Sequence, residues 1–98
     1  MSYLETRVAR KIPTTKGELI DKSGASVKVR FSLTQYQKYV EGIPTLRSAD
    51  GTLQFKDQNE AWTAMDGELR TLKGGGIQAN VYVDTVGSFR VTGPVNEI

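Results

Sequence analysis

The carboxylates of this chain are most concentrated in one short stretch, where Asp57, Glu60, Asp66 and Glu68 follow one another closely. Paired carboxylates can act as general acid and base, but hydrolytic sites take them from two facing elements. These four belong to a segment that we expect to be one helix, and they lack the spacing of a calcium-binding loop. We therefore predict that they cap the helix and solvate its surface.

Histidine and cysteine are both missing from the sequence. Their absence excludes imidazole general bases, Ser-His and Cys-His nucleophiles, disulfides and thiolate metal sites. The run Gly74–Gly76 does not fit a phosphate-binding loop, because a helix is expected before it and a strand after it, which is the reverse of the required order. We therefore expect a protein that is not an enzyme and that has no cofactor and no metal.

Basic residues are more frequent in the first half of the chain, where residues 1–42 carry eight lysines and arginines against four acidic residues. This imbalance favours an anionic partner, although a mixed solvated surface would have the same composition. Single-stranded nucleic acid is bound by a basic groove that follows the phosphates and by aromatic rings that stack on bases. The candidate residues for such a surface are Arg7, Arg10, Lys28, Arg30, Tyr82 and Arg90.

Two segments alternate apolar and polar residues with the period of a strand. In residues 26–33, Val27, Val29, Phe31 and Leu33 share one face, and residues 77–83 repeat the pattern. Phe89 and Val91 indicate a last strand. Hairpin-type connections between the strands predict a mostly antiparallel sheet of five or six strands.

One long amphipathic helix is expected over residues 58–72, with Asp57 as its N-cap. Trp62, Met65, Leu69 and Leu72 recur at helical spacing and should pack on the sheet. A short helix from Thr34 would bury Tyr36, Tyr39 and Val40, and the same three side chains would form a protein-contact patch if they were exposed. A hairpin is expected over residues 46–55, with its turn at Asp50-Gly51. Residues 3–12 fit a short helix or a strand.

These elements predict a single α+β domain over residues 1–98, with residues 94–98 loose at the C-terminus. The order of three strands, a helix and two strands is that of the OB-fold, but the expected extra hairpin and helix depart from it. No apolar run is long enough to span a bilayer or to serve as a signal peptide, so we expect a cytoplasmic protein.

Two short stretches resemble the motifs of PilZ-type cyclic-dinucleotide receptors. Residues 7–11 resemble the Arg-x-x-x-Arg stretch of that family, with Lys11 in place of the second arginine. Residues 21–26 resemble its Asp/Asn-x-Ser-x-x-Gly turn, with Ser26 in place of the glycine. The resemblance implies a cyclic-dinucleotide ligand, but lysine cannot clamp a phosphate as a guanidinium does.

From these observations we expect a small non-enzymatic binding or accessory protein that acts through protein–protein contacts, including self-association. The alternative is an OB-like domain that binds nucleic acid through a basic sheet face. A cyclic-dinucleotide receptor is the second alternative.

Overall fold

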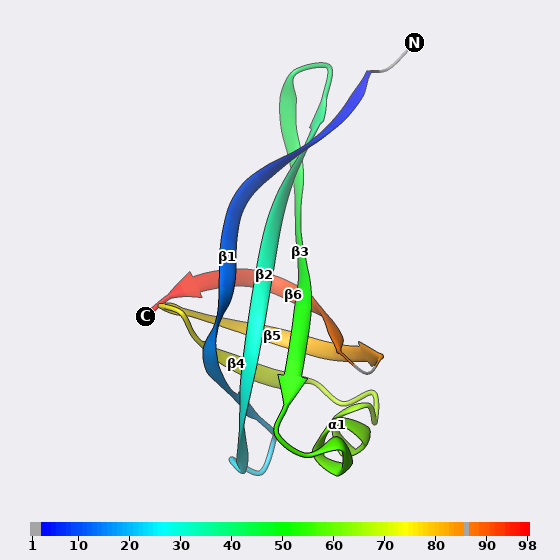
Figure 1. The fold of residues 1–98 in the computed structure, drawn as a ribbon. Coiled ribbons are helices and arrows are strands. Elements are labelled where there is room, and N and C mark those ends of the chain that lie inside the picture. Colours follow the sequence, from blue (N-terminus) through cyan, green and yellow to red (C-terminus); the bar gives the residue numbers. More distant parts are fainter. Residues whose placement is uncertain (1–2, 86) are drawn as a thin grey trace.

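The computed structural model of the protein describes residues 3–85 and 87–98, and this part of the chain forms a closed antiparallel barrel with one short helix (Figure 1). The strands follow the order β1-β2-β3-β6-β5-β4 around the barrel. The elements are β1 (Leu4–Ile20), β2 (Ser26–Val40), β3 (Ile43–Phe55), α1 (Gln58–Ala64), β4 (Arg70–Gly74), β5 (Ile77–Thr85) and β6 (Ser88–Glu97).

Two three-stranded meanders of unequal length make up the barrel. Strands β1 to β3 run from top to bottom in Figure 1, and the shorter β4, β5 and β6 cross them in the lower half. The barrel closes where residues 17–20 of β1 pair with β4 and where residues 50–52 of β3 pair with β6. The long strands continue beyond both seams, so they project as a three-stranded extension. We call this extension the arm and define it as residues 4–10, 35–40 and 43–48.

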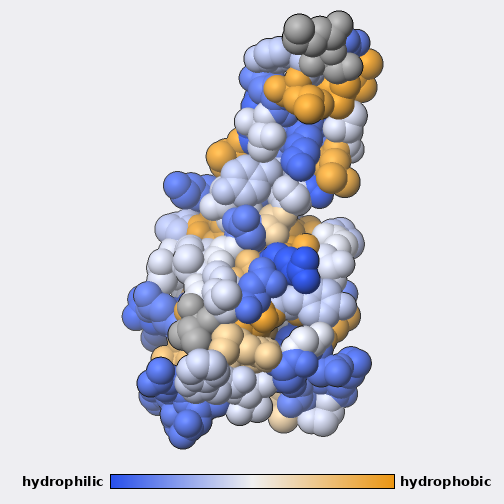
Figure 2. All heavy atoms as spheres, turned by 90° about the vertical axis from the view of Figure 1, so that its right-hand side faces the viewer, coloured by the Kyte–Doolittle hydropathy of each residue, from blue (hydrophilic) through white to orange (hydrophobic). Residues whose placement is uncertain are grey.

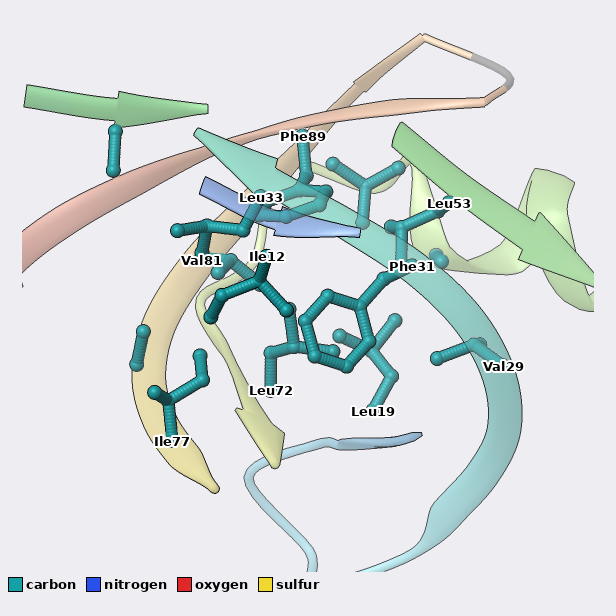
Figure 3. Packing of buried hydrophobic residues seen from close by; sticks show 14 residues of the cluster. Ile12, Leu19, Val29, Phe31, Leu33, Leu53, Leu72, Ile77, Val81 and Phe89 are labelled. Atoms are coloured by element: carbon teal, nitrogen blue, oxygen red, sulfur yellow. The ribbon is translucent and has the colours of Figure 1, made fainter. Parts of the chain in front are cut away.

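The barrel interior contains the apolar positions of both alternating segments, as expected. Val29, Phe31 and Leu33 of β2 are buried, and so are Ile77, Ala79, Val81 and Val83 of β5. Their side chains converge between the strands with those of the neighbouring strands (Figure 3). Hydrophobic burial along one face of each strand is therefore what holds the two meanders together.

Each buried phenylalanine ring lies against a glycine on a neighbouring strand. A Cβ atom on Gly51 would lie 2.7 Å from Cζ of Phe89, and one on Gly17 would lie 2.6 Å from Cε1 of Phe31. Both distances are shorter than carbon atoms tolerate, so only glycine leaves room for the rings. These glycines allow a narrow barrel to hold two aromatic side chains.

The predicted packing of the sheet on one long amphipathic helix is wrong. Asp57 does cap α1, but the helix ends at Ala64, and residues 70–74 form β4. Gly67 adopts a φ of 79°, which a helix does not allow, and the guanidinium of Arg70 donates to the carbonyl oxygen of Ala64. The buried side of α1 carries Ala61 and Ala64, and Trp62 is 59% exposed.

The predicted short helix from Thr34 and the hairpin at Asp50-Gly51 are also wrong. Residues 34–40 continue β2, and Asp50-Gly51 lies inside β3 opposite β2. The turn of the β2–β3 hairpin is Glu41-Gly42, whose φ values of 52° and 80° match the tight turns that join antiparallel strands. Glutamate is unusual at positive φ, so the sequence Glu41-Gly42 did not predict a tight turn.

The two ends of the described chain also pair with neighbouring strands. Residues 3–12, left open between helix and strand, lie mostly in β1, and Pro13 falls where the β1–β2 register shifts. Residues 95–97, which we expected to be loose, pair with residues 77–79 of β5. The described residues include no helix with the length and hydrophobicity needed to cross a membrane.

Candidate anion-binding groove

An open groove of about 770 Å³ lies on the barrel below the arm. Strands β1, β2 and β4, the end of β3 and the last residue of the chain line it. Its cationic side chains are Lys16, Lys28, Arg30, Lys56 and Lys73, and its other lining residues are Gly17, Glu18, Val29, Gln54, Phe55, Gly74 and Ile98.

Strand register explains why these cations converge. Arg30 pairs with Lys16 of β1 on one side and with Gln54 of β3 on the other. In the next row Glu18 pairs with both Lys28 and Lys73. Residues directly opposite one another in antiparallel strands project on the same face with Cβ atoms about 5 Å apart. Two adjacent rows on the outer surface of the barrel therefore gather charges that are far apart in the sequence.

The positive charge of the groove is not neutralised within the described part of the chain. Glu18 is the one acidic side chain among the lining residues, and none of the five cations forms an ion pair within 4 Å of a described carboxylate. Several like charges held this close repel one another. An anion in the groove would remove that repulsion.

Five cations outside the groove form ion pairs with described carboxylates, which none of the groove cations does. The nitrogen–oxygen distances of these pairs are 2.7–3.5 Å, and the pairs are Arg7–Glu5, Arg10–Glu97, Lys22–Glu68, Arg70–Asp66 and Arg90–Asp84. The hydrogen bond that Arg7 donates to Glu5 raises the pKa of Arg7, and the one that Lys22 donates to Glu68 raises the pKa of Lys22. These cations are therefore less available to an external anion than those of the groove.

The floor between the cations is apolar. Phe55 pairs with the buried Val29, so its ring is directed toward the core and half-buried at the edge of the groove, whereas Ile98 is 69% exposed. Gly17 and Gly74 present backbone without side chains, and a Cβ at Gly74 would lie 2.5 Å from the carbonyl oxygen of Lys16. The groove thus combines cationic walls with an apolar base that includes one aromatic ring.

The six residues predicted to face an anionic partner do not form one surface. Lys28 and Arg30 lie in the groove, whereas Arg7 and Arg10 lie in the arm. Tyr82 and Arg90 pair across β5 and β6, where the guanidinium lies 5.6 Å from the ring centroid and 3.1 Å from Asp84. Only the β2 pair therefore belongs to the candidate site.

Three of the groove cations were missed by the sequence reasoning. Lys16, Lys56 and Lys73 were not among the residues predicted to face an anionic partner. A weak signal was present, because Lys16 and Glu18 alternate with Gly17 as strand residues do. Without the pairing of β1 with β2 and β4, this pattern does not reveal which cations are neighbours.

Asp57, Asp66 and Glu68 of the acidic cluster cap the helix or pair with cations. Asp57 accepts a hydrogen bond from the backbone N–H of Asn59 at 2.9 Å. Two hydrogen bonds from the Arg70 guanidinium, at 2.7 and 3.0 Å, lower the pKa of Asp66 to about 2. Glu68 pairs with Lys22. Among residues 3–85 and 87–98, no three acidic side chains come together where they could hold a metal ion.

The two stretches that resemble PilZ motifs lie at opposite ends of β1. Arg7 is in the arm, and the turn that begins at Asp21 follows the other end of the strand. The Asp21 carboxylate accepts hydrogen bonds from Ser23 and Ala25, and the bond from the Ser23 hydroxyl is the main cause of its lowered pKa. The two stretches do not form one ligand site.

Comparison of the chain with protein-family models, with curated proteins and with solved structures found no match in any of the three.

Proposed function

We propose that this protein binds single-stranded nucleic acid in the groove. The observation that supports the proposal is the convergence of five cations from four parts of the barrel, none of them ion-paired within residues 3–85 and 87–98. The cations would contact successive phosphates, and the accessible part of the half-buried Phe55 ring would contact a base, as cations and aromatic rings do in sequence-independent single-strand binding. A volume of about 770 Å³ is within the range of ligand sites and would hold a few nucleotides.

The shape of the site favours a single strand over a duplex. Proteins that recognise bases in the major groove insert a helix or a two-stranded ribbon whose side chains have unpaired hydrogen-bond donors. Helix α1 has seven residues and begins at an acidic cap, and the arginines of the arm are held by Glu5, Glu97 and Gln37. The groove is concave, so it would admit an extended strand whose bases are unstacked.

Fold-level analogy points in the same direction but is weaker evidence. A small barrel with a helix after its third strand has the element order noted above for the OB-fold. This barrel has six strands within its described residues, where that fold has five. The proposal therefore depends on the groove and not on the fold.

Binding is tested by the fluorescence anisotropy of a labelled single-stranded oligonucleotide titrated with the protein. We expect saturable binding that an unlabelled single strand competes away more effectively than a duplex of the same sequence. Arg30→Ala should weaken binding about tenfold, because charge-assisted contacts to phosphate contribute roughly 1.5 kcal/mol.

Arg7→Ala is the matched control, since it removes the same side chain and the same charge from a site outside the groove. Arg7 lies in the arm and is paired with Glu5. Equal losses in the two variants would mean that overall charge, and not the groove, attracts the oligonucleotide. Absence of binding at low salt would refute the proposal.

A further inference from the structure

In the arm, the apolar side chains lie on the opposite face of the sheet from those in the barrel. In β2 the odd-numbered residues up to Leu33 point into the barrel and are apolar. Beyond Thr34 the strand continues without a break, but the odd-numbered residues become Gln35, Gln37 and Tyr39. The even-numbered residues Tyr36 and Val40 then supply the apolar side chains. The face of the arm that continues the outer surface of the barrel is therefore the apolar one.

Cross-strand pairing assembles this outer face from all three strands. Val40 pairs with Leu4 and with Ile43, and Tyr36 pairs with Val8. Leu46 lies in the β3 segment where the register with β2 shifts. Leu4, Ile43, Leu46 and Val8 are 74, 65, 59 and 58% exposed. Apolar side chains gather on this projecting end of the molecule in Figure 2.

The opposite face of the arm is polar, and several of its side chains contact one another. Nε of Arg47 donates to Oε1 of Gln37 at 2.8 Å. The guanidinium of Arg7 lies 4.9 Å from the centroid of the Tyr39 ring and pairs with Glu5. Of the predicted contact patch, Tyr36 and Val40 thus lie on the apolar outer face, and Tyr39 lies on the polar face.

We propose that the outer face of the arm packs against the same face of a second copy of this chain. Four side chains more than half exposed, with Tyr36 and Val40 beside them, present on the order of 500 Å² of mainly apolar surface, as much as the largest patch of a typical monomer. Two copies face to face would bury about 1,000 Å² in total, the lower limit for a specific interface.

The charge of the face favours a second copy over a different partner. Lys38 is the one charged side chain that alternation places among its described residues, so the face has no charge pattern to match on another protein. The lysine stem is long enough for the ammonium to reach water at the rim of an interface. A two-fold interface needs only one self-complementary patch, and this face supplies it.

Association through the arm would leave the groove open in both copies. The groove is lined by residues 16–18 and 28–30, whereas the arm ends at the Glu41-Gly42 turn at the far end of the same strands. The dimer would therefore present two grooves. This inference is independent of what the groove binds.

Sedimentation equilibrium of the full chain over a range of concentrations tests the proposal. We expect a mass that rises from 10.8 kDa to twice that value. Leu4→Gln and Ile43→Thr should each raise the dimer Kd about tenfold or more, the effect of losing one buried apolar side chain. Trp62→Gln is the control, because it removes a large side chain of similar exposure from α1. Circular dichroism checks that each variant is folded.

A second measurement uses the absence of native cysteine. Thr6→Cys places a thiol on the outer face, and Thr63→Cys places one on α1. Mild oxidation should yield a covalent dimer from the first variant and much less from the second. A wild-type chain that stays monomeric at every concentration would overturn the proposal. A dimer weakened by Trp62→Gln but not by the arm substitutions would overturn it as well.

Discussion

Salt dependence offers the most quantitative test of the groove. Each phosphate neutralised on a single strand contributes about −0.7 to the slope of log Kobs against log salt. If all five groove cations contact phosphate, the slope is about −3.5, and affinity falls roughly 100-fold between about 50 and 200 mM salt. A smaller slope would show how many of the cations take part.

Removing two groove cations should change this slope by a calculable amount. Lys28→Ala with Arg30→Ala leaves three cations, so we expect a slope of about −2.1 and a loss of roughly 20-fold over the same salt range. Both side chains are exposed and form no ion pair with a described residue, so the double variant should unfold at the same urea concentration as the wild type. Anisotropy titrations at several salt concentrations measure the slope directly.

The control is a double variant with the same types of residue and the same change in net charge. Lys22→Ala with Arg7→Ala removes one lysine and one arginine that are paired outside the groove. Its slope should remain within experimental error of the wild-type value. If both double variants show the same slope, the groove does not contact the phosphates and the reasoning from its geometry fails.

Three further predictions concern the groove floor, the core and the Arg70 site. Phe55→Leu should weaken oligonucleotide binding about tenfold in anisotropy titrations, because it keeps an apolar side chain but removes the aromatic ring. Gly51→Ala should lower the free energy of unfolding in urea by about 3 kcal/mol, because its Cβ would overlap the Ser32 carbonyl oxygen and contact the Phe89 ring; an unchanged urea midpoint would contradict this packing. The lowered pKa of Asp66, about 2, stabilises the fold above its ordinary pKa of 3.8, and this stability is lost as pH falls through about 2. Because the side chain is 43% exposed, screening limits the effect to about 1 kcal/mol, and Asp66→Asn should remove that part of the pH dependence of urea unfolding.

The strands of the barrel were the most predictable part of the structure. In residues 26–33 and 77–83, apolar and polar side chains alternate strictly, and the apolar face of each strand is buried. The helix over 58–72 was overextended because Leu69 and Leu72 continue the helical spacing of Trp62 and Met65, although residues 70–74 form β4. What ends the helix is the positive φ of Gly67 together with the contact between Arg70 and the Ala64 carbonyl oxygen, and the second of these is a tertiary contact.

The candidate site was predictable only in part. Lys28 and Arg30 stand out because they alternate with buried residues of the same strand. Lys16, Lys56 and Lys73 give no such signal, because their relation to β2 depends on pairings between distant segments. The arm was missed for a related reason: the change of polarity at Thr34 in the middle of a strand was read as a change from strand to helix.

The sequence by itself determined which residues alternate between an apolar and a polar face, that histidine and cysteine chemistry is excluded, and that Asp57 begins a helix. Those properties depend on residue type and on spacing within a few positions. The tertiary structure alone decided that the sheet closes into a barrel, that five cations line one groove, and that the apolar face of the arm points outward. Each of these depends on the register between strands far apart in the chain, and local propensity does not encode that register.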